Sequence, residues 1–118
     1  YYKNAIITIV PLTKKSQRKR GFNQSSNIAQ FLSQKYHGNY LEIFVKNRET
    51  LKQALIHSKR KRLLNVKDSF SLKDNIVIKD KDVIVIDDLV TTGSTLQELF
   101  TCAQKHRVRN IIAITIAH

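Results

Sequence analysis

The spacing of apolar residues along the chain predicts buried strands that alternate with amphipathic helices. Residues Ala5–Val10 form a nearly continuous apolar run, which ends at Pro11. Proline has no backbone N–H and cannot continue a central strand. Val83–Ile86 is β-branched, as in strands that are covered on both faces, and Val108–Ile116 is again β-branched and apolar. We therefore predict a strand at each of these three places, buried in the first two.

Two segments carry apolar residues at helical spacing. We expect the first helix to be capped by Ser25 or Ser26 and to end at Gly38, with an apolar face made of Ile28, Ala29, Phe31, Leu32 and Tyr36. The second covers Thr95–His106 and has an apolar face made of Leu96, Leu99, Phe100 and Ala103. Strand, helix and strand in this order predict a single α/β domain with a mainly parallel sheet.

The middle of the chain has a different pattern. Leu41–Val45 is a short apolar run and favours a further strand. From Asn47 to about Lys67 the sequence is polar and basic, with a stretch at Ser58–Val66 that favours a helical turn. Segments of this length without regular structure are usually functional or mobile. We expect a long excursion from the domain here.

Length and composition indicate one globular domain. The chain has 118 residues, of which 42% are apolar and 25% charged, and no apolar run approaches the roughly 18 residues of a membrane span. A single cysteine, Cys102, excludes an internal disulfide, and we expect it to be structural. The four histidines lack zinc-ligand spacing. We expect a cytoplasmic protein, and the absence of methionine suggests a segment of a longer chain.

The chain is strongly basic. Its net charge of +12 comes from 21 Lys and Arg against 9 Asp and Glu, which predicts attraction to nucleic acid, free phosphates or an acidic membrane surface. The basic residues concentrate in two clusters, Lys14–Arg20 and Lys59–Arg62. Each cluster is either a solvated loop or a phosphate-binding segment, and composition alone leaves both interpretations open.

Two adjacent aspartates, Asp87 and Asp88, follow the strand predicted at Val83–Ile86. This is the carboxyl end of the strand, where open α/β sheets bind ligands. The next residues are rich in hydroxyl groups and include Gly93, so backbone N–H groups and a helix N-terminus can bind a phosphate there. Carboxylates repel phosphate but suit sugar hydroxyls or a divalent cation. The pattern predicts a phosphorylated sugar, bound by solvent-facing carboxylates. The alternative is an ordinary strand-to-helix loop, capped by Asp88 or Thr92.

Residues 83–95, VIVIDDLVTTGST, resemble the binding signature of type I phosphoribosyltransferases: four apolar residues, two acids, two apolar residues, then small hydroxylated residues around a glycine. The resemblance implies a type I phosphoribosyltransferase-like fold, with a mainly parallel central sheet flanked by helices, and 5-phosphoribosyl-1-pyrophosphate (PRPP) as ligand. Asp87 and Asp88 would be the catalytic pair on the ribose hydroxyls, with Mg²⁺ bound through PRPP. The other implied PRPP contacts are Leu89, Val90, Thr91, Thr92, Gly93, Ser94 and Thr95.

A second resemblance covers almost the whole chain. VPLTKKSQRKRGFNQSSNIAQFL and LKQALIHSKRKRLLNVKDSF are similar to segments of the ComF/GntX group of competence-associated phosphoribosyltransferase-like proteins. The matching positions are Arg18 or Arg20, Gly21, Phe22, Asn23, Gln24, Gln53, Arg62, Asn65 and Phe70. This implies a role in DNA uptake and natural transformation. Because the group usually begins with a four-cysteine zinc ribbon, zinc is expected only in an N-terminal region outside this segment.

These resemblances give the basic clusters roles. Pyrophosphate binding is implied for Thr13, Lys14, Lys15, Arg18 and Arg20. Single-stranded DNA is expected to contact Arg18, Lys19, Arg20, Lys59, Arg60, Lys61 and Arg62. Phe22 and Phe70 lie next to the clusters, where stacking on bases is one interpretation and burial in the core the favoured one.

The resemblance leaves the activity open. Type I enzymes use an additional hood segment to recognise the base, and the residues before Ala5 and after Ile116 are too few for one. We therefore expect PRPP binding without a hood, in a protein that works with single-stranded DNA and with uptake proteins such as a competence helicase, and that reaches the inner membrane only through such partners. The alternative is an active phosphoribosyltransferase of nucleotide metabolism, whose acceptor site is completed by a missing domain or partner.

Overall fold

A parallel sheet forms the centre of the protein. The computed structural model describes residues 4–11, 24–47, 58, 60–61, 67–88 and 93–116. Within these ranges the sheet contains β1 (Ile6–Ile9), β2 (Asn39–Tyr40), β5 (Asp82–Asp88) and β6 (Asn110–Ile116), in the order β2-β1-β5-β6. Each neighbouring pair is parallel. The predicted α/β domain with a mainly parallel sheet is confirmed, and the three strands predicted from apolar runs are present.

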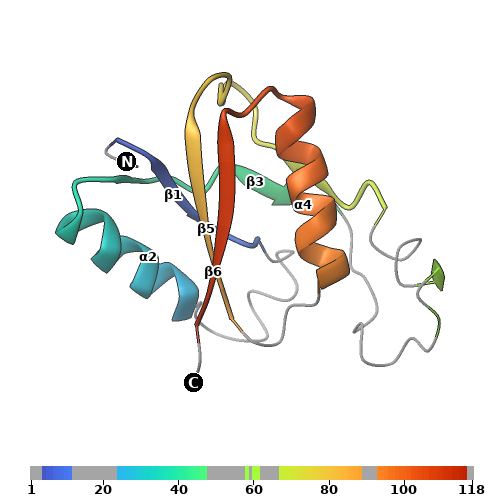
Figure 1. The fold of residues 1–118 in the computed structure, drawn as a ribbon, viewed down its shortest axis with the longest axis horizontal. Coiled ribbons are helices and arrows are strands. Elements are labelled where there is room, and N and C mark those ends of the chain that lie inside the picture. The colour runs from blue at the N-terminus through green and yellow to red at the C-terminus, as the bar shows by residue number, and fades with distance from the viewer. Residues whose placement is uncertain are drawn as a thin grey trace.

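Two helices pack on opposite faces of this sheet in the described part of the chain, α2 (Gln24–Lys35) and α4 (Gly93–Lys105) (Figure 1). Ala29 of α2 packs with Ile7, Ile9 and Ile86. On the other face, Leu99 and Ala103 of α4 pack with Ile6, Val83 and Val85. Side chains of β1 and β5 thus enter the two cores alternately, as expected for strands covered on both faces. Neither helix is long and apolar enough to cross a membrane.

A small antiparallel sheet extends the core on the α4 side. Its strands are β3 (Phe44–Lys46) and β4 (Phe70–Leu72), with Phe44 paired to Leu72 and Lys46 to Phe70. The sequence predicts a strand near Leu41–Val45 but not this partner. Phe70 is only 7% exposed and packs in the core with Leu99, which confirms the core interpretation of this residue. Phe22 lies outside the described residues.

The first turn of α2 differs from the prediction. The helix begins at Gln24, before both serines, so neither Ser25 nor Ser26 is its N-cap. Ser25 is buried, and the hydroxyl of Ser26 forms a 2.9 Å hydrogen bond with the hydroxyl of Tyr40 on β2. The serines therefore pack the helix against the edge of the sheet.

The end of α2 also differs in detail. The residue with left-handed backbone geometry is His37, at φ 58°, and the N–H of Gly38 donates to the carbonyl of Ser33 at 3.0 Å. This is the usual helix-ending motif, with His37 in place of the more common glycine. Gly38 is required for a different reason, because a Cβ there would lie 2.8 Å from Cδ1 of Ile7. The glycine lets the chain pass close to β1 as it enters β2.

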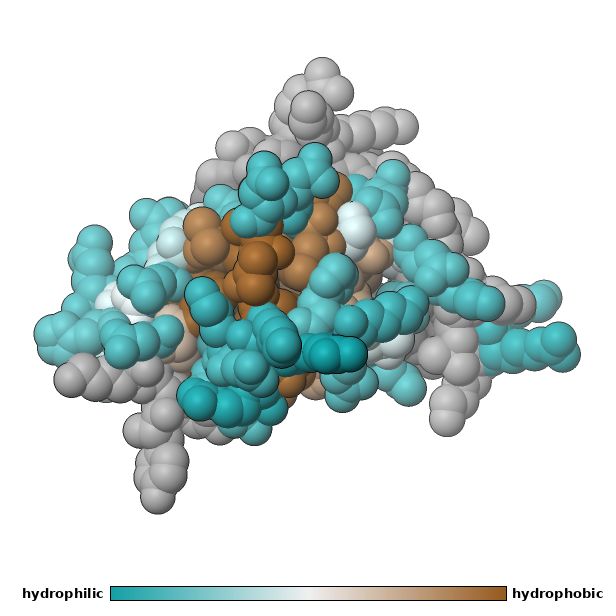
Figure 2. All heavy atoms as spheres, turned by 90° about the horizontal axis from the view of Figure 1, so that it is seen from above, coloured by the Kyte–Doolittle hydropathy of each residue, from teal (hydrophilic) through white to brown (hydrophobic). Residues whose placement is uncertain are grey.

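Some apolar side chains reach the surface. Seen from above, the protein shows an apolar patch framed by hydrophilic side chains (Figure 2). The large apolar residues exposed in the described ranges include Leu41, Val77 and Ile114, and two aromatic residues of α2 and its end, Phe31 and Tyr36.

Candidate functional site

The acidic pair lies at the carboxyl end of a central strand. Asp87 and Asp88 are the last two residues of β5. On one side Ile86 pairs in register with Ile9, the last residue of β1, and on the other side Asp87 pairs with Thr115 of β6. The pair is therefore flanked by the ends of two further parallel strands, which is where ligands bind in this fold class. Thr115 is exposed and had no signal in the sequence, since only the strand register brings it beside Asp87.

Asp87 is buried, and the expectation that both carboxylates face solvent is wrong for this residue. Only 3% of Asp87 is exposed. Alternation along β5 puts it on the same face as Val85, which packs under α4 with Leu99. A carboxylate is costly to bury without polar or charged partners. Asp87 is thus held rigidly at the edge of the core, with its position fixed by the sheet.

The N-terminus of α4 follows the acidic pair closely. The helix begins at Gly93, and its first turn contains no acidic residue. The predicted contacts Leu89, Val90, Thr91 and Thr92 lie outside the described residues, whereas Gly93 and Ser94 belong to the first turn and Thr95 is half-buried. The first N–H groups of a helix and its dipole favour an anion at this end. The carboxylate pair and a helix N-terminus thus stand on either side of one short strand-to-helix connection.

The described elements on either side of the first basic cluster meet the same edge of the sheet. Residues 12–23, which include Thr13 and Lys14–Arg20, lie outside the described ranges. Their flanking elements are described: β1 ends in register with the residue before Asp87, and the N-terminal end of α2 lies at the carboxyl edge of the sheet (Figure 1). The chain therefore leaves β1 beside the acidic pair and re-enters regular structure at the same edge.

The second basic cluster is described only at Arg60 and Lys61. Both are exposed and helical, and the N–H of Lys61 donates to the hydroxyl of Ser58 at 3.0 Å. The predicted helical turn is confirmed for these residues. They lie beyond α4, away from α2 (Figure 1). Exposure alone is compatible with a solvated loop or with phosphate binding.

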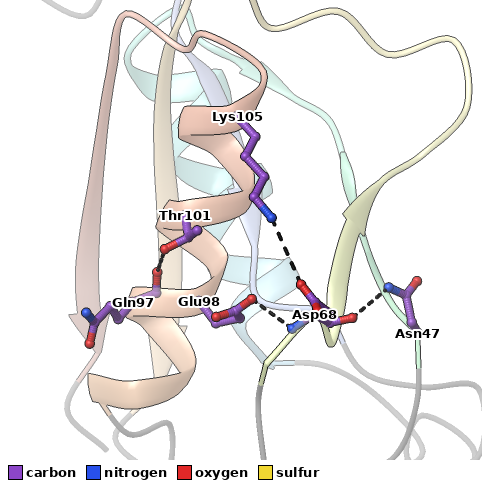
Figure 3. A network of polar contacts seen from close by, with 6 residues as sticks. All are labelled: Asn47, Asp68, Gln97, Glu98, Thr101 and Lys105. Carbon is purple, nitrogen blue, oxygen red and sulfur yellow. Dashed lines mark hydrogen bonds and ion pairs between the residues drawn. The ribbon is translucent and has the colours of Figure 1, made fainter. Parts of the chain in front are cut away.

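Polar contacts join the two flanks of this excursion to each other, and one of them to α4 (Figure 3). The N–H of Asp68 donates to Oε1 of Glu98 at 2.9 Å, and the side chain of Asn47 donates to the carbonyl of Asp68 at 3.2 Å. Lys105 lies 4.0 Å from the Asp68 carboxylate in an exposed ion pair. Residues 47 and 68 are thereby held side by side. The segment that carries the second cluster is therefore joined to α4 at its Asp68 end, and its Asn47 end is joined to Asp68.

The cysteine, a residue of α4, is buried. Cys102 is 8% exposed in the α4 core, and burial raises the pKa of its thiol. A thiol with a raised pKa is a poor nucleophile. Burial fits the expected structural role, which stays a prediction.

The described residues contain no group of three or more His, Cys, Asp or Glu side chains that could hold a metal ion. Any Mg²⁺ held at this edge by described residues would therefore need further oxygen ligands, such as those of a bound phosphosugar.

The phosphoribosyl transferase domain family matches residues 12–118, which include both basic clusters and the acidic pair. The chain belongs to this family. Its fold also matches the enzyme described as "structure of the allosteric regulatory enzyme of purine biosynthesis", with a TM-score of 0.57 over 97% of this chain and 23% of that chain. At 20% identity this likeness concerns the fold alone.

Two relatives have names that refer to DNA utilization or to competence. The chain is 36% identical over 94 residues to DNA utilization protein YhgH of Escherichia coli strain K12, which is 79% of this chain and 40% of that protein. It is also 36% identical over 104 residues to Competence protein F of Haemophilus influenzae, covering 86% of this chain and 45% of that protein. The resemblance to the competence-associated group is confirmed. The chain spans less than half the length of these relatives.

Proposed function

We propose that the carboxyl edge of the sheet binds PRPP. The observation that carries this proposal is the end of β5, where Asp87 and Asp88 are followed within one short connection by the N-terminus of α4. The carboxylates would accept hydrogen bonds from the ribose hydroxyls. The turn at 91–95 would bind the 5-phosphate through backbone N–H groups and hydroxyls.

The pyrophosphate of PRPP would be bound by Thr13, Lys14, Lys15, Arg18 and Arg20. This assignment is supported by the position of the flanking residues, because the segment that carries these cations leaves β1 directly beside the acidic pair. Hydrogen bonds between cationic side chains and phosphate oxygens are about twice as strong as neutral ones. The acidic pair would thus bind the ribose of PRPP, and the cations would bind its pyrophosphate.

Mg²⁺ fits this arrangement as a companion of PRPP. It prefers oxygen ligands, usually one or two carboxylates together with phosphates and water. Asp87 supplies a carboxylate that the sheet already holds in place. When bound, Mg²⁺ would neutralise charge on the pyrophosphate.

The biological role we propose is DNA uptake, with single-stranded DNA bound by the basic clusters. The names DNA utilization protein and Competence protein F support this role. The net charge of +12 and the exposed Arg60 and Lys61 supply the attraction to phosphates. PRPP would then be a ligand of a DNA-processing protein.

A second candidate function is phosphoribosyl transfer to a nucleobase, favoured by the domain family to which the chain belongs. The acceptor site would come from another part of a longer protein or from a partner. Release of pyrophosphate on addition of nucleobases to the PRPP-saturated protein would demonstrate it.

The experiment that tests the proposal is a thermal unfolding series with PRPP and Mg²⁺, compared with ribose 5-phosphate and with pyrophosphate. A ligand that binds only the folded state stabilises it by about 2.7 kcal/mol at a hundredfold excess over its Kd. We expect PRPP to raise the Tm more than either half alone. Equal shifts for PRPP and pyrophosphate would mean that the basic residues bind phosphate without a sugar site.

A further inference from the structure

Two aromatic side chains at the C-terminal end of α2 are largely exposed and share one cation. Phe31 is 61% and Tyr36 is 62% exposed. The Lys35 ammonium lies 6.0 Å from the centroid of the Phe31 ring and 5.7 Å from that of the Tyr36 ring. A cation within about 6 Å of a ring face is attracted to it. Lys35 therefore links the two rings into one surface, which we call the Phe31–Tyr36 face.

The surroundings of this face favour an anionic ligand. Helix α2, QSSNIAQFLSQK, contains no acidic residue, and the chain as a whole carries +12. Glu42 lies close to Tyr40 of the neighbouring β2. Burial raises the pKa of Tyr40, and the negative charge of Glu42 raises it further. A ligand with phosphates would therefore meet the charge of Lys35 and no carboxylate on α2.

A shallow hollow of about 340 Å³ is formed by α2 and β2. It is lined by Gln30, Ser33, Gln34, Gly38, Asn39 and Tyr40. The amide of Gln30 donates to the hydroxyl of Ser26 at 3.1 Å, and that hydroxyl is paired with Tyr40. Side-chain amides offer both donors and acceptors, as the edges of nucleobases do. Aromatic rings, a cation and amides are thus all carried by α2 and the residues that follow it.

We propose that the Phe31–Tyr36 face binds single-stranded DNA by stacking bases on its two rings. Proteins that bind single strands combine positive charge with exposed aromatic side chains, and stacking contributes without regard to base identity. Lys35 would contact a phosphate, and the amides of the hollow would contact base edges. This inference rests on the proposed binding of single-stranded DNA and adds a base-contacting surface, which the basic clusters do not supply.

The location makes the proposal separable from the basic cluster at Lys59–Arg62. Helix α2 lies on one face of the sheet, whereas Arg60 and Lys61 lie beyond α4 on the other side (Figure 1). Substitutions at the two places therefore act on different contacts. Phosphate contacts at Arg60 and Lys61 would form with any strand, whereas stacking at α2 would form only with a strand that carries bases.

The test compares two fluorescent oligonucleotides of equal length, single-stranded oligothymidine and an abasic strand that keeps the phosphates. Their affinities are measured by anisotropy for the wild-type chain and for a Phe31→Ala, Tyr36→Ala double variant. Val77→Ala serves as the matched control, because Val77 is 67% exposed at another place. Both rings are mostly exposed, so the double variant should keep the wild-type melting temperature.

We expect the double variant to bind oligothymidine at least tenfold more weakly, since each stacked base contributes at least about fivefold. Its affinity for the abasic strand should be unchanged, and Val77→Ala should match the wild type with both strands. Equal oligothymidine affinity of the wild type and the double variant would overturn the stacking proposal alone. So would an equal loss of affinity for the oligothymidine and the abasic strand in the double variant. Failure of the wild-type chain to bind either strand would overturn the proposed DNA binding and this inference together.

Discussion

Ile9, the last residue of β1, pairs in register with Ile86, which directly precedes Asp87 on β5. Because the two strands are parallel, the chain that continues from β1 into the first basic cluster starts next to the acidic pair. A phosphosugar needs carboxylates for its hydroxyls and cations for its phosphates, and in the site we propose both would come from this edge. The opposite end of β5 has a third aspartate, Asp82, which provides an internal control.

Asp82 is paired with a cation at the amino edge of the sheet. Nε and Nη2 of Arg109 donate to its two oxygens at 3.0 and 2.6 Å, and Asn110 donates a third hydrogen bond at 2.9 Å. These hydrogen bonds hold the pKa of Asp82 at about 2, below the usual 3.8. Since the folded-state pKa is the lower one, the stabilisation is complete above about pH 4 and is lost as the pH falls toward 2.

We therefore expect Asp82→Asn to lower the free energy of unfolding at pH 7, and the gap between wild type and variant to close between pH 4 and pH 2. Urea unfolding at several pH values measures this gap. A gap that stays constant across the acidic range would show that Asp82 is not held by its charge.

The salt dependence of DNA binding tests the second basic cluster. Replacing Lys59, Arg60, Lys61 and Arg62 by alanine should flatten the slope of log affinity against log salt by about two to three units, because each phosphate contact on a single strand contributes roughly 0.7. PRPP affinity should change little.

The matched control for that variant removes four exposed cations elsewhere, namely Lys73, Lys79, Lys81 and Arg107. It loses the same net charge but leaves the cluster intact. If both variants flatten the slope equally, binding follows net charge and the cluster is a solvated face.

Cys102 provides a test of the packing around α4. Burial raises the pKa of its thiol, so thiol reagents should react with the native protein slowly and with the unfolded protein at the ordinary rate. Cys102→Ser should lower stability by about 1 kcal/mol or more, because a hydroxyl replaces an apolar group in the core. PRPP affinity should be retained. Loss of PRPP binding in a variant of unchanged stability would give the cysteine a functional role instead.

Gly38 tests the close approach of the chain to β1. Gly38→Ala should destabilise the protein by roughly 1 to 3 kcal/mol, since the added Cβ would lie 2.8 Å from Cδ1 of Ile7, a buried residue. Ile7→Val removes that methyl group, so the glycine substitution should cost less in this background. A double-mutant cycle of unfolding free energies measures the difference. Strictly additive effects would show that the two residues do not interact.

The fold could be predicted where local pattern and burial agree. Val83–Ile86 is a β-branched run because a strand covered on both faces has no polar side. Val108–Ile116 has the same composition but forms the edge strand β6, where Ile114 is exposed. The β3 and β4 pair escaped prediction because each strand has three residues and its partner is distant in sequence. The sequence also did not show that His37, and not Gly38, takes the left-handed conformation that ends α2. The glycine is there because of its close contact with Ile7, which only the tertiary structure reveals.

In the candidate site, too, local features could be predicted and tertiary ones could not. The motif around Asp87 and Asp88 marks a strand end and a helix start, and both are present. Burial of Asp87 follows from which face of β5 lies under α4, and the neighbouring Thr115 follows from register. The Phe31–Tyr36 face was missed for a related reason. Phe31 and Tyr36 fit the apolar spacing of a helix, and only packing shows that they remain outside the core.

The most direct test of the PRPP site is a calorimetric titration of PRPP with Mg²⁺ into the wild-type chain, Asp87→Asn, Asp88→Asn and the control Asp82→Asn. Each substitution removes one carboxylate with little change in volume, and loss of a hydrogen bond to a charged group costs about 1.5 to 3 kcal/mol. We predict saturable binding to the wild type, binding weakened roughly tenfold or more in Asp87→Asn and Asp88→Asn, and wild-type affinity in Asp82→Asn. Equal PRPP affinity in all four proteins would contradict the assignment of the acidic pair to the ribose.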